Sequence, residues 1–335
     1  MLDFATSFYL PRRFPRSRRI AVTAALLIPV LLAGCRRAPI DAVKNGNSAS
    51  ARRLRADLAL VPADAHIVIS VDFDRLRAMP SWNGLAATSG KEAALLFDGF
   101  AKGTGIDLLS QVRRVLVAFP GDGRADQGFT LIAEVASLDE TRVAAWLGRQ
   151  HDERTTAIVH GGHRIVLAKG AWATSVAALA KGDASTPSAT GNAELRRLCE
   201  RAVGDHVLWF AAIVPAALRR DLIAQARFPD LASLARLWGT VDVDSGMRVE
   251  SVAELSNEAD ARSLAHRLSA YLNAAKHHPD MLAQGLSPYL EGARLVAQGP
   301  LVRATLEAPA AQQGDLLERI GALAKAAWTK TAASR

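Results

Sequence analysis

Alternating carboxylates are the first feature of this sequence that could do chemistry. Asp72 and Asp74 flank a phenylalanine, and Asp242 and Asp244 flank a valine. In a strand, residues i and i+2 point to the same face, so either pair could offer oxygen ligands to a divalent cation. Aspartate is also typical of strand ends, where it initiates turns. The second pair lacks the further acidic ligand and terminal glutamate of a calcium loop. We therefore expect both pairs to be solvated strand ends.

Histidine supplies the second possible chemistry. His160 and His163 flank a Gly-Gly dipeptide, which predicts a hairpin with the two imidazoles opposite each other. Two histidines can share a zinc ion, but a stable site needs three or four ligands, so we expect exposed turn residues. The pair His277-His278 precedes Pro279. That arrangement is typical of a helix C-terminus, where imidazolium complements the helix dipole.

Common catalytic motifs are missing from the sequence. There is no Gly-x-Ser-x-Gly, His-Glu-x-x-His or Cys-x-x-Cys, the patterns of many hydrolases and redox enzymes. The loop over residues 121–128 has neither the glycine spacing of a dinucleotide fingerprint nor the lysine of a phosphate loop. We therefore predict no catalytic residue, metal site or cofactor. A hydrolase or transferase with a dispersed active site, using Asp72/Asp74 or His160/His163, stays open as the alternative.

The two cysteines have different surroundings. Cys199 falls in a predicted helix over residues 193–202, with Leu195, Leu198 and Ala202 on one side. No histidine or metal-type spacing lies near it, so a buried, inert thiol is expected there rather than a nucleophile. Cys35 follows an apolar run from Ala21 to Leu32, itself preceded by five arginines over residues 12–19. That run is shorter than the roughly 20 residues of a membrane span and fits the core of a signal peptide.

The string Leu32-Ala33-Gly34-Cys35 resembles the lipobox of bacterial lipoprotein precursors. The resemblance implies that residues 1–34 are removed as a signal peptide and that Cys35 is acylated. It places the chain on the bacterial cell envelope. Arg36 stands where an aspartate would retain a lipoprotein in the inner membrane, which favours the outer membrane, facing the periplasm, in a Gram-negative host. An unmodified cysteine in a signal anchor is the alternative.

The net charge of +8 belongs to the N-terminal part of the chain. From Leu58 onward there are 30 basic and 30 acidic residues. A nucleic-acid-binding body would carry a basic face of its own, so we predict no nucleic-acid partner. The basic excess over residues 36–57 can instead lie near anionic headgroups. That segment contains Asn, Gly and Ser and has no apolar periodicity before Leu54, as is typical of a flexible linker.

Strand and helix patterns in the body follow the same order twice. Strands are predicted over residues 66–72, 113–119, 129–136, 155–159 and 164–168, and again over 206–214, 239–244, 247–255, 294–298 and 302–307. Helices are predicted over 216–237, with a break at Pro229, and over 258–276 after Asn257. The segments 129–137 and 248–256 are alike in sequence, and each leads into an amphipathic helix.

These patterns predict an α+β fold of two similar units, each a largely antiparallel sheet with helices packed on one face. The expected organisation is a signal peptide over 1–34, lipidated Cys35 with a flexible tether over 35–57, a first unit over 58–182, a linker over 183–192 and a second unit over 193–335. Residues 61–72, beginning Val-Pro-Ala-Asp-Ala, are similar to uncharacterised bacterial anchored proteins with repeated α+β units. That resemblance implies no catalytic residues.

Together the sequence predicts a lipid-anchored cell-envelope protein that works as a non-enzymatic interaction or ligand-binding module. The membrane is reached through the N-terminal lipid anchor. An envelope protein, a lipid or a glycan is the expected further partner, because interfaces between duplicated halves favour ligand sites. A structural spacer is a third possibility.

Overall fold

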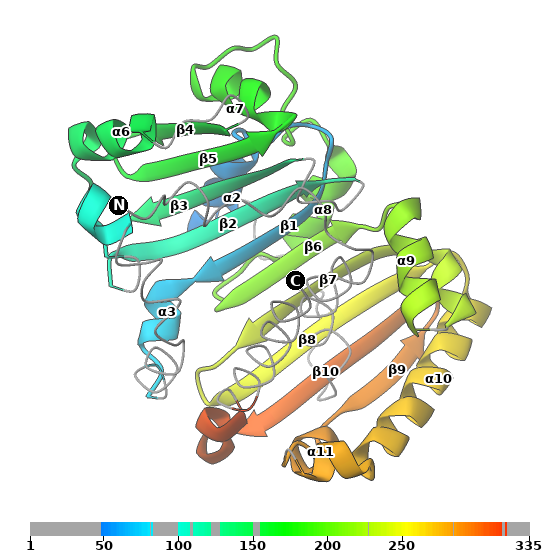
Figure 1. Cartoon of the computed structure of the whole chain (residues 1–335). Coiled ribbons are helices and arrows are strands. Elements are labelled where there is room, and N and C mark those ends of the chain that lie inside the picture. Colours follow the sequence, from blue (N-terminus) through cyan, green and yellow to red (C-terminus); the bar gives the residue numbers. More distant parts are fainter. Residues whose placement is uncertain are drawn as a thin grey trace, which may run out of the picture. The chain divides into compact units, whose positions relative to one another are not determined.

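The computed structural model describes residues 48–80, 82, 100–107, 110–121, 128–149, 155–226, 228–283, 285–316 and 319. They fall into two compact units. The first holds residues 48–76 and the described residues from 100 to 215, and the second holds 77–80, 82 and those from 216 onward. Each unit combines antiparallel strands with helices (Figure 1). The expected mixture of helices with largely antiparallel strands is therefore confirmed.

Six antiparallel strands form the sheet of the first unit, in the order β4-β5-β3-β2-β1-β6. β1 lies inside this order, with Val68 opposite Ala118 of β2 on one side and opposite Ala211 of β6 on the other. The strands are β1 (Ala65–Asp72), β2 (Val112–Pro120), β3 (Gly128–Val135), β4 (Thr155–His160), β5 (Arg164–Gly170) and β6 (Leu208–Ile213).

Two helices of the first unit, α2 and α8, begin at a capping side chain. Ser48 Oγ accepts a hydrogen bond from Ala51 N at 3.1 Å at the start of α2, and Asn192 Oδ1 accepts one from Leu195 N at 3.1 Å at the start of α8. Such caps satisfy backbone donors that a helix cannot pair internally. The helices with both ends described are α2 (Ala49–Leu58), α3 (Phe73–Arg77), α6 (Glu140–Arg149), α7 (Trp172–Ala180) and α8 (Ala193–Ala202). Residues 100–104 are helical as well.

Helices cover both faces of the first unit's sheet. Arg164 and Ile165 are consecutive in β5 and therefore point to opposite faces. Arg164 Nη2 lies 3.8 Å from the Asp57 carboxylate of α2, whereas Ile165 packs in one apolar cluster with Val143 of α6. α2 and α6 thus lie on opposite sides of the strand. The expectation of helices on one face is wrong for this unit. The residues on one face of β5 pack against α6, and on the other face Arg164 pairs with Asp57 of α2, so each face is covered by a helix.

The second unit has four antiparallel strands in the order β7-β8-β10-β9. Leu264 and Leu268 of α10 pack with Leu255 and Val302 in its apolar core. The strands are β7 (Leu234–Asp242), β8 (Gly246–Leu255), β9 (Arg294–Gln298) and β10 (Leu301–Pro309). The helices with both ends described are α9 (Ala216–Ala226), the 3-10 helix η2 (Pro229–Ser233), α10 (Glu258–Lys276), α11 (Pro279–Ala283) and α12 (Ser287–Glu291). Residues 310–316, after β10, are helical as well.

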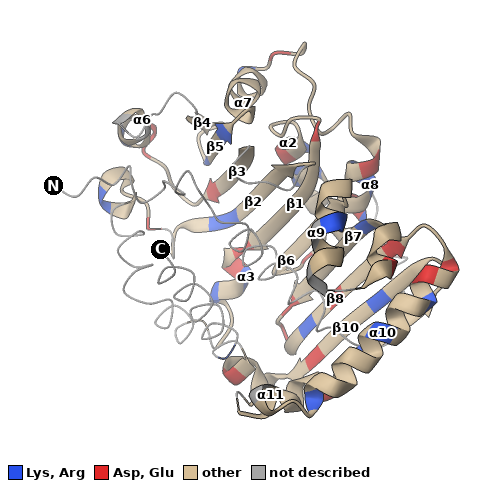
Figure 2. Ribbon diagram, turned by 45° about the vertical axis from the view of Figure 1, so that its right-hand side comes forward, with Lys and Arg blue, Asp and Glu red and all other residues tan. Residues whose placement is uncertain are grey.

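Strand alternation in the second unit separates an apolar face from a charged one. Val249 and Ala304 belong to a core cluster that includes residues of α10 and α12. The neighbouring Glu250 and Arg303 point the other way and pair at 2.9 Å. β8 and β10 accordingly carry both acidic and basic residues (Figure 2).

Three sequence expectations differ from the structure. α2 occupies residues 49–58, where a flexible tether was expected, and Leu54 and Leu58 are buried. The expected linker over 183–192 is hydrogen-bonded into the body, since Ala189 N donates to Val61 O at 2.7 Å. The expected helix over 216–237 ends at Ala226, and β7 begins at Leu234 because this segment pairs with β8.

Candidate functional site on α2 and α8

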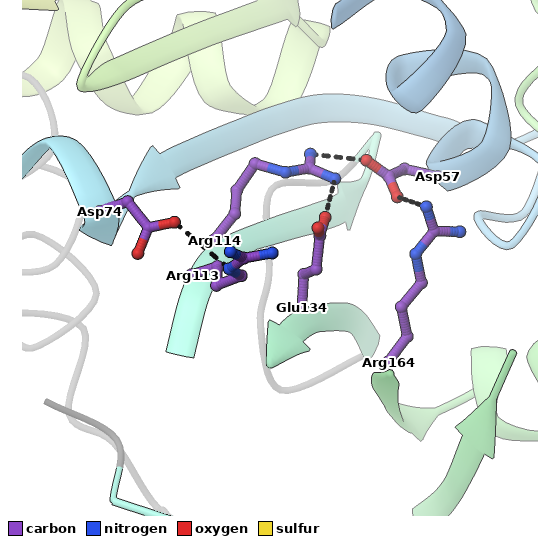
Figure 3. Close-up of polar contacts among 6 residues, drawn as sticks. All are labelled: Asp57, Asp74, Arg113, Arg114, Glu134 and Arg164. Carbon is purple, nitrogen blue, oxygen red and sulfur yellow. Dashed lines mark hydrogen bonds and ion pairs between the residues drawn. The ribbon is translucent and has the colours of Figure 1, made fainter. Parts of the chain in front are cut away.

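Two of the four carboxylates nominated from the sequence, Asp72 and Asp74, lie next to arginines. Asp72 is the last residue of β1, and its Oδ1 accepts a hydrogen bond from Arg75 N at 3.0 Å. Asp74 lies in α3, so the strand alternation that would align the two side chains is broken. Asp74 Oδ2 is 3.5 Å from Arg113 Nε (Figure 3). Asp242 ends β7, and Asp244 lies in the turn before β8.

The histidines are also placed differently from the predicted cross-hairpin pair. The register of β4 and β5 sets His160 opposite Arg164, and His163 lies in a three-residue turn. His163 is exposed, with Nδ1 2.6 Å from Gly161 O. The prediction of opposed imidazoles is therefore wrong, although exposure of His163 in a turn is confirmed. His277 is the C-cap of α10, as expected.

The described part of the chain holds neither a metal-type cluster nor a membrane-crossing helix. No group of three or more His, Cys, Asp or Glu side chains there is placed to hold a metal ion. None of the helices there is both long and apolar enough to cross a membrane.

Cys199 has the surroundings of a structural thiol. It lies in α8 with no exposed area, and burial raises its pKa well above the ordinary value for a thiol. A thiol held in its neutral form is a poor nucleophile. The prediction of a buried Cys199 is confirmed. Cys35, the expected lipidation site, lies outside the described residues.

A buried ionic cluster joins α2 to the sheet of the first unit (Figure 3). Arg114 of β2 donates from Nη1 to Asp57 Oδ2 at 2.6 Å and from Nη2 to Glu134 Oε2 at 3.2 Å. Arg164 Nη2 lies 3.8 Å from Asp57 Oδ1. The side chain of Asp57 has no exposed area, and those of Arg114, Glu134 and Arg164 are at most 15% exposed. The cluster therefore fixes α2 on the sheet.

Removal from water governs the protonation of this cluster. Burial raises the pKa of Asp57, because desolvation outweighs the attraction of Arg114 and Arg164. For Arg114, burial acts to lower the pKa, but the carboxylates of Asp57 and Glu134 raise it by more. Arg114 thus stays charged. The cluster was not predicted from the sequence. Its only local signal is a stripe at helical spacing after a capping serine, formed by Ala51, Leu54, Asp57 and Leu58.

The solvent side of α2 is basic. Arg52, Arg53 and Arg55 are exposed, while the only acid of the helix, Asp57, is buried against the sheet. Arg55 also lines a pocket of about 410 Å³ together with Arg196, Arg197 and Glu200 of α8 and with Thr190. Arg196 is oriented there by Thr190, whose carbonyl accepts from Nη1 at 2.8 Å. We call the exposed side of these two helices the α2–α8 surface.

Comparison with known proteins assigns no family. No family model matches the chain, and no curated protein matches it. A solved structure described as crystal form I of TP0453 is similar at a TM-score of 0.40 and 11% sequence identity. The match covers 78% of this chain and 96% of that one. A likeness of this degree assigns neither fold nor function.

Proposed function

We propose that this chain is a lipid-anchored protein of the bacterial cell envelope and acts as a non-enzymatic interaction or ligand-binding module. The observation that carries the proposal is Leu32-Ala33-Gly34-Cys35 directly after an apolar run and five arginines. Acyl chains on Cys35 with basic residues nearby would anchor the chain stably. In a Gram-negative host the outer membrane, facing the periplasm, is the proposed location, with an envelope protein, a lipid or a glycan as partner.

The start of α2 supports an anchored body held near the membrane. Ser48 caps α2, so 13 peptide steps separate Cys35 from the first described helix. Whatever their conformation, these steps cannot span more than about 45 Å. The body would therefore stay within reach of the bilayer surface.

Side-chain placement favours the interaction module over a dispersed active site. Asp72 and Asp74 are directed to Arg75 and Arg113, and His160 is opposite an arginine. An enzyme using these residues would need them to converge on one substrate position.

We also infer that the body contains two similar α+β units that arose by duplication. In support, the order β2-β3-β5-β4 in the first unit corresponds to β7-β8-β10-β9 in the second. Along the chain, α6 lies between β3 and β4, and α10 is the first of the helices between β8 and β9. The similar segments 129–137 and 248–256 are the corresponding β3 and β8 regions.

Metabolic labelling tests the anchor. The full chain is expressed in a Gram-negative bacterium fed an alkyne-tagged palmitate, and the mature protein is analysed by mass spectrometry. We expect label on a chain that begins at Cys35 and its recovery with outer-membrane fractions. Cys35→Ala should lose the label and the processing, whereas Cys199→Ala should keep both. An unmodified Cys35, or cleavage at another residue, would contradict the proposal.

The binding role needs its own experiment. Cells expressing the anchored protein are crosslinked, and the protein is then purified and analysed for attached proteins, lipids and glycans. We expect one partner to recur, and to be absent when an unrelated lipoprotein is treated in the same way. Recovery of the uncrosslinked chain alone would favour the structural spacer.

A further inference from the structure

We propose that the α2–α8 surface docks on the anionic headgroups of the membrane that holds the anchor. This proposal rests on the proposed acylation of Cys35 and adds to it a second membrane contact, one that would orient the body. The occupant is the phospholipid surface itself, recognised through its phosphate groups.

Charge on the surface is one-sided because of how α2 is docked. The helix turns Arg52, Arg53 and Arg55 to solvent and buries Asp57, whose charge Arg114 meets at 2.6 Å. No acid of α2 therefore offsets its exposed arginines. α8 adds three arginines and two glutamates, which gives six arginines against two glutamates over the two helices. From Leu58 onward the chain as a whole is balanced in charge.

The pocket between the two helices provides a place for a phosphate. Arg55, Arg196 and Arg197 line it, and Glu200 is its acidic member. Arg196 is held by Thr190 O and by Glu200 Oε1, the latter 3.9 Å from Nε. Guanidinium groups bind phosphate oxygens through several donors in a fixed plane, so a partly fixed arginine beside exposed ones is suited to a headgroup.

Chain connectivity selects the membrane as the occupant. α2 is the first described element after Cys35, and the 13 intervening steps limit its distance from the acylated residue to about 45 Å. Tethering turns a weak contact into an intramolecular one with a high effective concentration. Basic residues that come within a Debye length of an anionic surface, about 8–10 Å, are attracted to it.

Arginine footprinting on the anchored protein tests this contact. The full chain is reconstituted through its own anchor in vesicles of phosphatidylcholine alone or with about 30 mol% phosphatidylglycerol. Phenylglyoxal modification is then read by mass spectrometry. We expect modification of Arg53, Arg55 and Arg197 to fall by about threefold or more in the anionic vesicles, and to recover in about 0.5 M salt. Arg262, exposed on α10 and paired with Glu258, serves as the internal reference.

Matched variants separate docking from general charge. Arg53→Gln combined with Arg197→Gln should abolish the protection that remains at Arg55, whereas Arg262→Gln should leave it unchanged. The protein should also co-float with both vesicle types in a density gradient. If it does so but the surface is modified equally in both, docking is overturned and the anchor is left intact. Failure to float with either vesicle would overturn the anchor and docking together. Equal protection by inorganic phosphate on phosphatidylcholine vesicles would reassign the surface to a soluble anion and overturn membrane docking.

Discussion

Arg114 on β2 donates to Asp57 on α2 across 2.6 Å, and the two residues are 57 positions apart in the sequence. Removing Arg114 would take away the main partner of the Asp57 carboxylate, which has no exposed area. We expect Arg114→Met to lower the free energy of unfolding by about 3–5 kcal/mol, measured by chemical denaturation. Arg113→Met is the matched control, because its pair with Asp74 is half exposed and is worth about 1 kcal/mol or less. Equal losses in the two variants would contradict a structural role for the buried pair.

Acidity should increase the contribution of Asp57 to the free energy of unfolding. Because its folded-state pKa is raised above the ordinary value of 3.8, the folded chain holds this proton more tightly than the unfolded chain. The stabilisation is complete below the unfolded value and is lost as the pH rises through the folded pKa. Relative to Asp57→Asn, the wild type should therefore gain unfolding free energy as the pH falls from about 7 towards 4. A series of denaturation curves checks the sign, and a relative loss on acidification would refute it.

Asn192 does more than cap α8. Its Oδ1 accepts from Leu195 N, and its Nδ2 donates to Ala63 O and Ala65 O at 3.2 Å each. Asn192→Ala should cost about 2 kcal/mol, since a cap is lost and two carbonyls lose a donor. Asn257→Ala at the start of α10 removes an exposed cap and should cost about 1 kcal/mol. Thermal or denaturant unfolding of the two variants gives the comparison. The prediction fails if Asn257→Ala lowers the free energy of unfolding by more than Asn192→Ala does.

Cys199 should report unfolding through its reactivity. The thiol is fully buried, and its raised pKa keeps it protonated at neutral pH. We expect maleimide labelling of the native protein to be slower than labelling in denaturant by about a thousandfold or more, because the chain must open first. Leu198→Ala would leave a cavity beside Cys199 in α8. It should speed native labelling because it destabilises the fold. Fast labelling of native wild-type protein would show that Cys199 is accessible.

Elements with strong local signals could be predicted from the sequence. α8 and α10 have the expected bounds, because each combines a capping asparagine with an apolar stripe at helical spacing. β9 also has the expected bounds, since Gly299-Pro300 marks the turn into β10. β7 was missed in part because residues 234–237 have a helix-compatible composition, and their pairing with β8 is set by tertiary context.

The ionic cluster was out of reach of sequence patterns. Asp57, Arg114, Glu134 and Arg164 come from α2, β2, β3 and β5, and each alone resembles a solvated charge. Only the sheet register, which sets Arg114 opposite Glu134 and Glu134 opposite Arg164, brings three of them into one row. This row of charges binds Asp57 and so determines which side of α2 faces the sheet. The arginines of α2 are left on the side that faces water.

The interior position of β1 has a consequence for the order of biosynthesis. Its second neighbour, β6, begins at Leu208, so one edge of β1 has no partner until 136 further residues have followed Asp72 along the chain. At ordinary synthesis speeds this delay is on the order of ten seconds. During that interval the unpaired edge is open to other chains, as exposed strand edges are prone to aggregate. A nascent chain stopped near residue 192 would keep that edge permanently open, whereas one extended past Ile213 could close it.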